Sequence, residues 1–111
     1  WHVPTDAEWT VLTDYLTANG HSGTEGAPLK ATSGWNANGN GTDYYGWNGL
    51  PGGWRSISGN FGYVGDVGSW WSSSESSSSN AWDRNLSDHG DDVGRNPDTN
   101  EEGGSVRCVK D

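Results

Sequence analysis

The side chains best suited to chemistry are carboxylates gathered near the C-terminal end of the chain. They are Asp88, Asp91, Asp92, Asp98, Glu101 and Glu102. Hard oxygen ligands of this kind suit Ca²⁺, but the spacing of an EF-hand loop is absent. Runs of like charge more often form solvated faces, so the pattern favours an acidic surface over a metal site.

The other reactive side chains do not indicate catalysis. His2, His21 and His89 lack metal-ligand spacing, and Cys108 is the only cysteine, so no internal disulfide can form. The serine-rich residues 72–79 could supply a catalytic Ser-His-Asp triad together with His89 and an aspartate. With so many Ser and Asp in the chain, however, such a combination is expected by chance. We therefore expect no enzyme activity, no bound metal and no cofactor.

Composition narrows the partners and predicts an unusual core. The 111 residues carry a formal net charge of −9, which disfavours nucleic acid and anionic lipid, and no apolar run could cross a membrane. Leu, Ile, Val and Phe together number only 14, whereas there are eight Trp, four Tyr and 18 Gly. We expect one loop-rich domain over residues 1–111 with an aromatic core. Because the chain has no Met, we interpret it as the C-terminal piece of a longer protein.

These side chains must be positioned by one helix and several short strands. Thr5 to Glu8 is a capping-box pattern, and Trp9, Leu12 and Leu16 follow at helical spacing. The sequence predicts a helix from Asp6 to Ala18 that buries these three apolar side chains and ends at Asn19-Gly20.

Alternation of apolar residues with turn formers predicts short antiparallel strands after the helix. The expected strands lie within residues 46–55, 61–64, 68–72, 81–87 and 105–109, and residues 72–79 form an ordered loop. Residues 21–45 are expected to be connecting structure, with a short element near 29–31. The predicted fold class is therefore α+β, with long loops.

Side-chain alternation also predicts which faces are buried. It places Trp82, Arg84 and Leu86 on one face of a strand, and Asp83, Asn85 and Ser87 on the other. In the last strand Val106 and Cys108 point inward, which makes Cys108 a buried, inert thiol. Adjacent Trp70 and Trp71 point to opposite faces, most Trp are core residues, and Arg84 is expected to pair with a carboxylate.

Several motifs carry a family resemblance. Residues 1–9 (WHVPTDAEW), 29–35 (LKATSGW), 49–55 (GLPGGWR), 70–75 (WWSSSE) and 105–111 (SVRCVKD) resemble the Fibrobacter succinogenes major paralogous domain over essentially the whole chain. The resemblance implies a C-type-lectin-like fold of the formylglycine-generating-enzyme-like branch, with adjacent termini. The leading strand expected before Trp1 is missing or short, so the closing strand should pair with a stub. The cysteine pair or histidine-rich iron site of related enzymes is absent.

The resemblance also points to a variable region at residues 83–104. Domains of this type are frequent targets of diversity-generating retroelements, which rewrite asparagine codons by mutating adenines. Most residue types at 83, 87–92, 94 and 97–99 can be reached from such a codon, whereas Glu101 and Glu102 need a lysine-type codon. The flanking motifs are those of the family.

We therefore predict a non-catalytic ligand-recognition domain of a bacterial surface protein, of adhesin or pilus-tip type. Its partner would be a protein or glycan on another cell or a phage. The expected binding residues are Asp83, Asn85, Ser87, Asp88, His89, Asp91, Asp92, Asn96, Asp98, Thr99, Asn100, Glu101 and Glu102. This segment lacks aromatic anchors beyond residue 82, which favours weak or electrostatic binding to a basic partner. The alternative is a vestigial enzyme-like structural domain in a secreted glycan- or cell-wall-active protein.

Overall fold

The computed structural model describes residues 1–111 and has one α-helix, α1 (Asp6–Leu16), which continues into a wider turn, η1 (Thr17–His21). The Thr5 hydroxyl accepts from the Glu8 amide at 3.1 Å, and the Glu8 carboxylate accepts from the Thr5 amide at 2.8 Å. This reciprocal pair satisfies amide groups that a helix start leaves free. Gly20 then ends the helical path with φ of +93°, which glycine adopts without strain. The predicted helix is confirmed, with its last turn widened.

The buried face of α1 is narrower than the spacing predicts. Trp9 and Leu16 are buried, but Leu12 is only partly buried and packs at the edge of the core. Leu12 instead lines a shallow apolar groove with Trp47 and Val109. Nothing else covers Leu12 on that side, so the prediction that it is fully buried is wrong.

The strands form two antiparallel sheets, which confirms the α+β class. A hairpin joins β1 (Trp54–Arg55) to β2 (Phe61–Gly62), and a second sheet has the order β3 (Val67–Glu75), β4 (Asn80–Ser87), β5 (Gly94–Thr99). Strand β5 is not predicted by the sequence, since it is polar and contains Pro97. It forms because it pairs with β4 along its whole length, and an edge strand tolerates proline.

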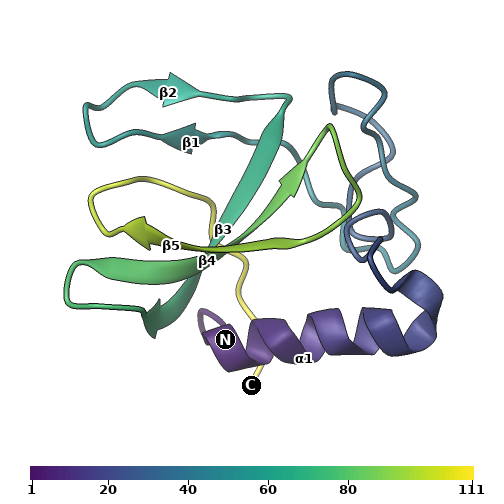
Figure 1. Ribbon diagram of the computed structural model, residues 1–111, viewed down its shortest axis with the longest axis horizontal. Helices are drawn as coiled ribbons and strands as arrows, with labels where there is room; N and C mark the ends of the chain where they lie inside the picture. The colour runs from purple at the N-terminus through teal and green to yellow at the C-terminus, as the bar shows by residue number, and fades with distance from the viewer.

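The C-terminal segment connects the two sheets rather than closing one of them. Arg55 and Gly103 exchange backbone hydrogen bonds of 2.8 and 3.0 Å, and Ser105 bonds to Ser69 and Trp71 at 2.9 and 3.0 Å. Residues 103–105 therefore lie between β1 and β3, as Figure 1 shows for the yellow segment.

Beyond Ser105 the predicted closing strand is absent apart from one bridge between His2 and Val109. The Arg107 guanidinium lies 4.8 Å from the centre of the Trp47 ring, so Arg107 is the residue that packs against the domain. Residues 106–111 are all exposed, Val106 and Cys108 among them. The predictions that both point inward, and that Cys108 is a buried thiol, are wrong.

The connecting residues 22–53 pack against the β4–β5 loop. Lys30 is buried, and its Nζ donates to the carbonyls of Ser87 and Gly90 at 3.1 and 2.9 Å. Gly39 approaches the backbone of Asp88 so closely that a Cβ would lie 2.4 Å from its Cα. Only glycine fits this contact, which holds the connecting residues against the sheet.

Trp side chains make up half of the buried core group, but five of the eight Trp lie outside it, so the prediction that most Trp are core residues is wrong. The buried apolar residues are Trp9, Leu16, Leu29, Trp35, Trp70 and Leu86. The partly buried Trp47 bridges this group, with ring centres 6.1 Å from Trp9 and 4.9 Å from Trp70 in edge-to-face geometry. Trp71 is half-buried on the opposite face of β3, as predicted.

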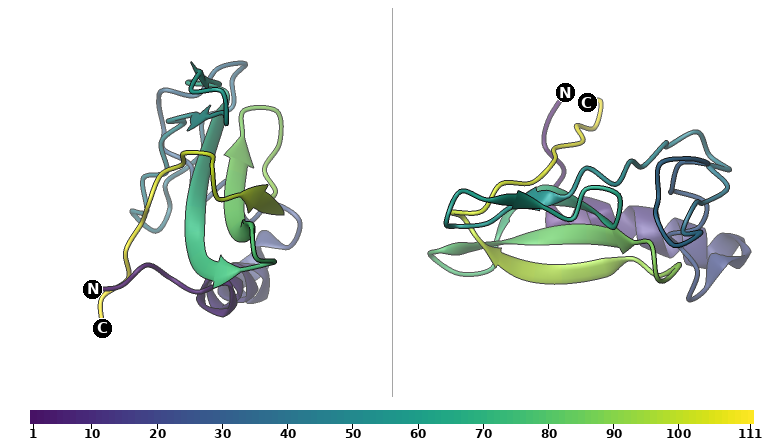
Figure 2. Two further views of the ribbon diagram at one scale, coloured as in Figure 1. Left: turned by 90° about the vertical axis from the view of Figure 1, so that its left-hand side faces the viewer. Right: turned by 90° about the horizontal axis from the view of Figure 1, so that it is seen from above.

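The two termini lie side by side, as expected from the resemblance (Figure 2). The Trp1 ammonium contacts the Asp111 carboxylate at 2.8 Å, and His2 bonds to both Asp111 and Glu8. The domain's α-helix is too short and too polar to cross a membrane.

Candidate functional site

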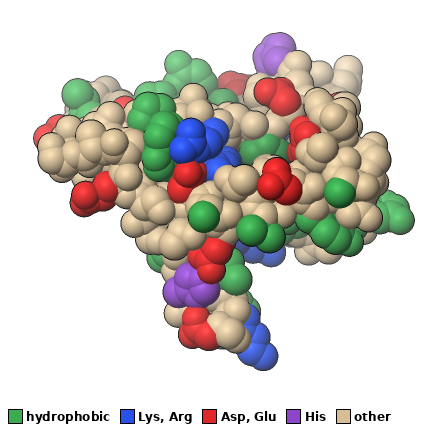
Figure 3. Space-filling model, turned by 60° about the horizontal axis from the view of Figure 1, so that its bottom comes forward, with side chains coloured by type: hydrophobic (Ala, Val, Ile, Leu, Met, Phe, Trp, Pro, Cys, Tyr) green, Lys and Arg blue, Asp and Glu red, His purple; other side chains and the backbone are tan.

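An ion-pair cluster lies on the side of the three-stranded sheet that faces α1. Arg84 donates to the Asp6 carboxylate at 2.6 Å, and Arg95 makes two further bonds to it of 2.9 Å. The Arg95 guanidinium also lies 3.5 Å from the centre of the Trp82 ring. Figure 3 shows this face, where the basic atoms touch acidic and hydrophobic side chains. The hydrogen bonds from Arg95 and Arg84 lower the pKa of Asp6 to about 2 despite partial burial. The expected pairing of Arg84 is confirmed, and it ties α1 to β4.

Because side chains alternate along a strand, the residues next to Arg84 point to the other side of the sheet. There they line a pocket of about 260 Å³ between the sheet and the β1–β2 hairpin. We call it the acidic pocket; its lining residues are Trp54, Val67, Ser69, Asp83, Asn85, Asn96, Asp98 and Glu102. Five of the thirteen predicted binding residues therefore meet in one cavity.

Asp83 lies at the floor of the acidic pocket and is only 1% exposed. Its carboxylate accepts from the Ser69 hydroxyl at 2.6 Å and from the Asn96 amide at 3.2 Å. Burial and the neighbouring Asp98 charge raise the pKa of Asp83 to about 6, against the Ser69 hydrogen bond. The predicted alternation is confirmed, but the prediction that Asp83 is displayed on the surface is wrong. Residues 102–105 and β1 cover this face of β4.

Several polar side chains around Asp83 have no hydrogen-bond partner within the domain. Those of Asn85, Asn96 and Glu102 make no hydrogen bond within the domain, and no Lys, Arg or His lies within 4.0 Å of the carboxylates of Asp83, Asp98 or Glu102. Burial and the Asp98 charge raise the pKa of Glu102. Carboxyl and amide groups in this arrangement can bind a ligand that supplies hydrogen-bond donors. Perturbed carboxyl groups in a cavity are typical of functional sites.

A second group of predicted binding residues lies at the end of β4 and in the β4–β5 loop, where two of the carboxylates contact other side chains of the domain. Asp88 is 7% exposed, its amide donates to Asp66 at 2.9 Å, and its carboxylate pairs with His89. The Asp91 carboxylate contacts the buried Lys30 ammonium at 3.0 Å. Ser87, Asp88, His89, Asp91 and Asp92 do not line the acidic pocket, and their expected part in binding stays a prediction.

The remaining predicted residues form the turn that follows β5. Thr99 is half-buried and accepts from the Glu102 amide at 3.0 Å, whereas Asn100 and Glu101 are exposed. This turn places Glu102 in the lining of the pocket. The domain has no group of three or more Asp, Glu, His or Cys side chains that could hold a metal ion.

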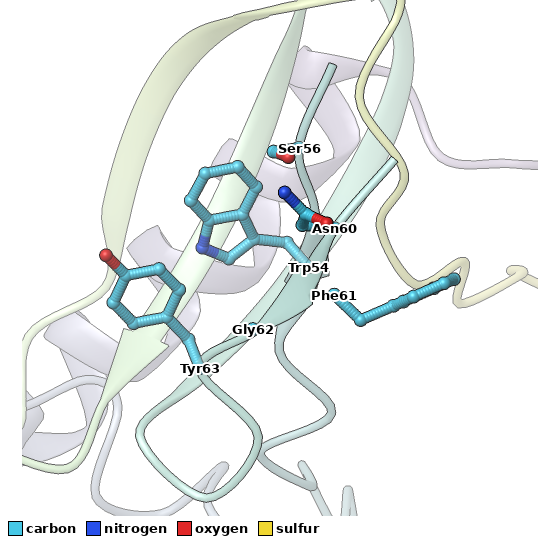
Figure 4. A pocket seen from close by; sticks show the side chains of 6 residues that line it. All are labelled: Trp54, Ser56, Asn60, Phe61, Gly62 and Tyr63. Carbon is cyan, nitrogen blue, oxygen red and sulfur yellow. The ribbon is translucent and has the colours of Figure 1, made fainter. Parts of the chain in front are cut away.

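One wall of the acidic pocket was not predicted from the sequence. Trp54 stacks on Tyr63, with ring centres 5.4 Å apart and planes inclined by 7°. Tyr63 adopts a φ of +62°, which turns its ring to the Trp54 side of the hairpin. Phe61 points away from the two rings, and all three residues line one hollow of about 230 Å³ (Figure 4). Strand alternation could identify Trp54 as a strand residue, but nothing in its spacing indicated the pocket.

The fold and the site define a small α+β domain with a carboxylate- and amide-lined pocket under an aromatic hairpin. The chain belongs to the Fibrobacter succinogenes major domain family, whose family model matches residues 1–110. No curated protein and no solved structure gave a significant match to the chain.

Proposed function

We propose that this domain is a non-catalytic ligand-recognition module, with the acidic pocket as the centre of its binding site. The observation that carries the proposal is the convergence of Asn85, Asn96 and Glu102, whose polar groups the domain leaves unpaired, around the carboxyl groups of Asp83 and Asp98. Pockets with a few convergent polar groups are the usual sites of ligand binding.

Binding is favoured over catalysis by what lines the pocket. Ser69 is the only hydroxyl there, and it donates to Asp83 rather than to a histidine. The lining includes no His, Lys or Cys, so a Ser–His, a Cys–His or a lysine nucleophile is not assembled there. Polar side chains on a fixed scaffold suit adaptable hydrogen bonding to a partner.

The proposal extends to the setting of the domain. We assign it a C-type-lectin-like fold in a bacterial surface protein of adhesin or pilus-tip type, binding a protein or glycan of another cell or a phage. Residues 83–104 are then the segment that a retroelement diversifies. They contribute β5 and most polar residues of the pocket, which supports this assignment.

The test is a parallel selection on a glycan array and on a displayed library of peptides and surface proteins. A pocket variant, Asn85→Ala/Asn96→Ala/Glu102→Gln, is compared with a matched surface variant, Thr24→Ala/Thr32→Ala/Ser33→Ala. The control residues are exposed and make no side-chain hydrogen bond. Ligands selected on the unmodified domain should bind the pocket variant at least tenfold more weakly and the control unchanged. Equal binding to both variants, or chemical conversion of a selected ligand, would overturn the proposal.

A further inference from the structure

The β1–β2 hairpin, whose Trp54 lines the acidic pocket, exposes several large apolar side chains. Phe61 is 81% exposed, Ile57 62% and Tyr63 57%, and the half-buried Trp54 completes the group. We call these four residues the hairpin patch. Adjacent exposed apolar residues mark interaction surfaces more often than scattered ones do.

Trp54 belongs both to the hairpin patch and to the acidic pocket. It lines the hollow that contains Phe61 and Tyr63, and it also lines the cavity whose floor is Asp83. Its ring is held by stacking on Tyr63, and its strand is held by the backbone bonds between Arg55 and Gly103. A ligand that enters the pocket therefore meets a fixed aromatic wall.

Charge identifies the chemistry of that ligand. Asp83, Asp98 and Glu102 have no cationic partner within the domain, whereas Asp6 and Asp91 are paired. Cations are attracted to the face of a Trp ring as well as to carboxylates, and Arg or Lys can use both at once. The formal net charge of −9 attracts a basic partner from a distance.

Size indicates that one side chain, rather than a larger group, occupies the cavity. Its volume of about 260 Å³ lies below the roughly 300–1,000 Å³ of typical small-molecule sites. The adjoining apolar side chains can then cover neighbouring residues of the same partner. No three of the pocket's carboxylates lie close enough together to hold a metal ion, which argues against a metal ion as the occupant.

We propose that the acidic pocket and the hairpin patch form a docking surface for a basic segment of a protein partner. One Lys or Arg side chain of the partner enters the pocket beside Trp54, and apolar residues next to it pack on Phe61 and Ile57. This inference rests on the proposed function and specifies the chemistry of its ligand.

The experiment is an NMR titration of the ¹⁵N-labelled domain with blocked tripeptides Gly-Arg-Gly, Gly-Lys-Gly and Gly-Glu-Gly. The Trp54 indole signal is assigned from the spectrum of Trp54→Phe. The basic peptides should shift the signals of Trp54, Asn96 and Asp98, and the acidic peptide should not. Asp98→Asn/Glu102→Gln should weaken binding of the basic peptides at least tenfold.

The matched control is Asp92→Asn/Glu101→Gln, which removes the same charge from exposed positions outside the pocket. It should weaken binding less than twofold, which separates contact from net charge. A blocked Leu-Arg-Leu peptide should bind more tightly than Gly-Arg-Gly, and Ile57→Ala/Phe61→Ala should remove that gain. The dispersion of each variant's NMR spectrum verifies its fold.

Two results would overturn the inference. One is the absence of shifts at Trp54 with either basic peptide, and the other is equal weakening by the pocket and control variants. If ligands from the selection occupy the pocket but are neutral glycans or acidic peptides, the inference fails while the proposed function stands. If no selected ligand depends on the pocket, both fail.

Discussion

Replacing Asp83 by asparagine tests whether an ionisable carboxyl at the floor of the acidic pocket costs the domain stability at neutral pH. The substitution keeps the size of the side chain and removes its charge. The oxygen of the introduced amide can still accept from the Asn96 backbone N–H, and its NH₂ group can donate to the Ser69 hydroxyl. The substitution therefore changes the titration of the pocket more than its packing.

The size and sign of the effect follow from the pKa of Asp83, which burial raises from 3.8 to about 6. Between these two values the folded state binds more protons than the unfolded state, so stability falls as pH rises through this window. A shift of about two units corresponds to about 3 kcal/mol, at 1.36 kcal/mol for each unit. Asp83→Asn should escape this loss and be more stable than the unmodified domain at pH 7, by up to about 3 kcal/mol.

Urea unfolding followed by Trp fluorescence, at intervals from about pH 4.5 to 7.5, measures the free energy of unfolding. The unmodified domain should lose stability across this range, and Asp83→Asn should lose less. Asp92→Asn, at an exposed position, serves as the control and should parallel the unmodified domain. The reasoning is refuted if Asp83→Asn is less stable than the unmodified domain at pH 7, because the ionised carboxylate would then be a stabilising group.

Three further predictions concern the scaffold. Trp9→Ala removes a core aromatic that is 4% exposed, so it should cost about 3–5 kcal/mol in thermal or urea unfolding, and a shift of only a degree or two would contradict its place in the core. Asp6→Asn should cost about 2 kcal/mol at pH 7, because the pKa of Asp6 is lowered from 3.8 to about 2. The unmodified domain should lose this stability as pH falls from about 4 to 2. An equal loss of stability by both proteins over that pH range would argue against the role of Asp6. Cys108 is exposed, so a thiol reagent should modify it without denaturant, and protection from the reagent until unfolding would restore the buried assignment.

The helix could be predicted because its determinants are local. Thr5 and Glu8 are three residues apart and satisfy one another's backbone amides, and Gly20 supplies its own left-handed conformation. The spacing of Trp9 and Leu16 then fixes the buried face. Each of these features depends on a few neighbouring residues, and the structure confirms all of them.

Features that depend on distant partners could not be predicted in this way. Strand β5 has a polar sequence with no alternation, and it is a strand because β4 offers it a hydrogen-bonded ladder. Asp83 was expected on the surface because alternation gives a face but does not say what covers that face. Trp54 of β1 and Glu102 lie on that face, and the backbone bonds of Gly103 to Arg55 and of Ser105 to Ser69 hold their segments there. No pattern within residues 102–105 indicates those partners.

Within residues 83–104, the contacts of each side chain distinguish positions that hold the fold from positions that can change. Arg84 and Leu86 are buried on the helix side, and Asp88 is buried under the connecting residues, so replacing them removes contacts that assemble the domain. The side chains of Asn85 and Glu102 point into the acidic pocket and make no hydrogen bond within the domain. Substitution at these two positions changes what the cavity offers a ligand while leaving the hydrogen bonds of the fold in place. A binding site built on such positions can change its specificity without losing its scaffold, because the groups that recognise a ligand are not the groups that hold the strands together.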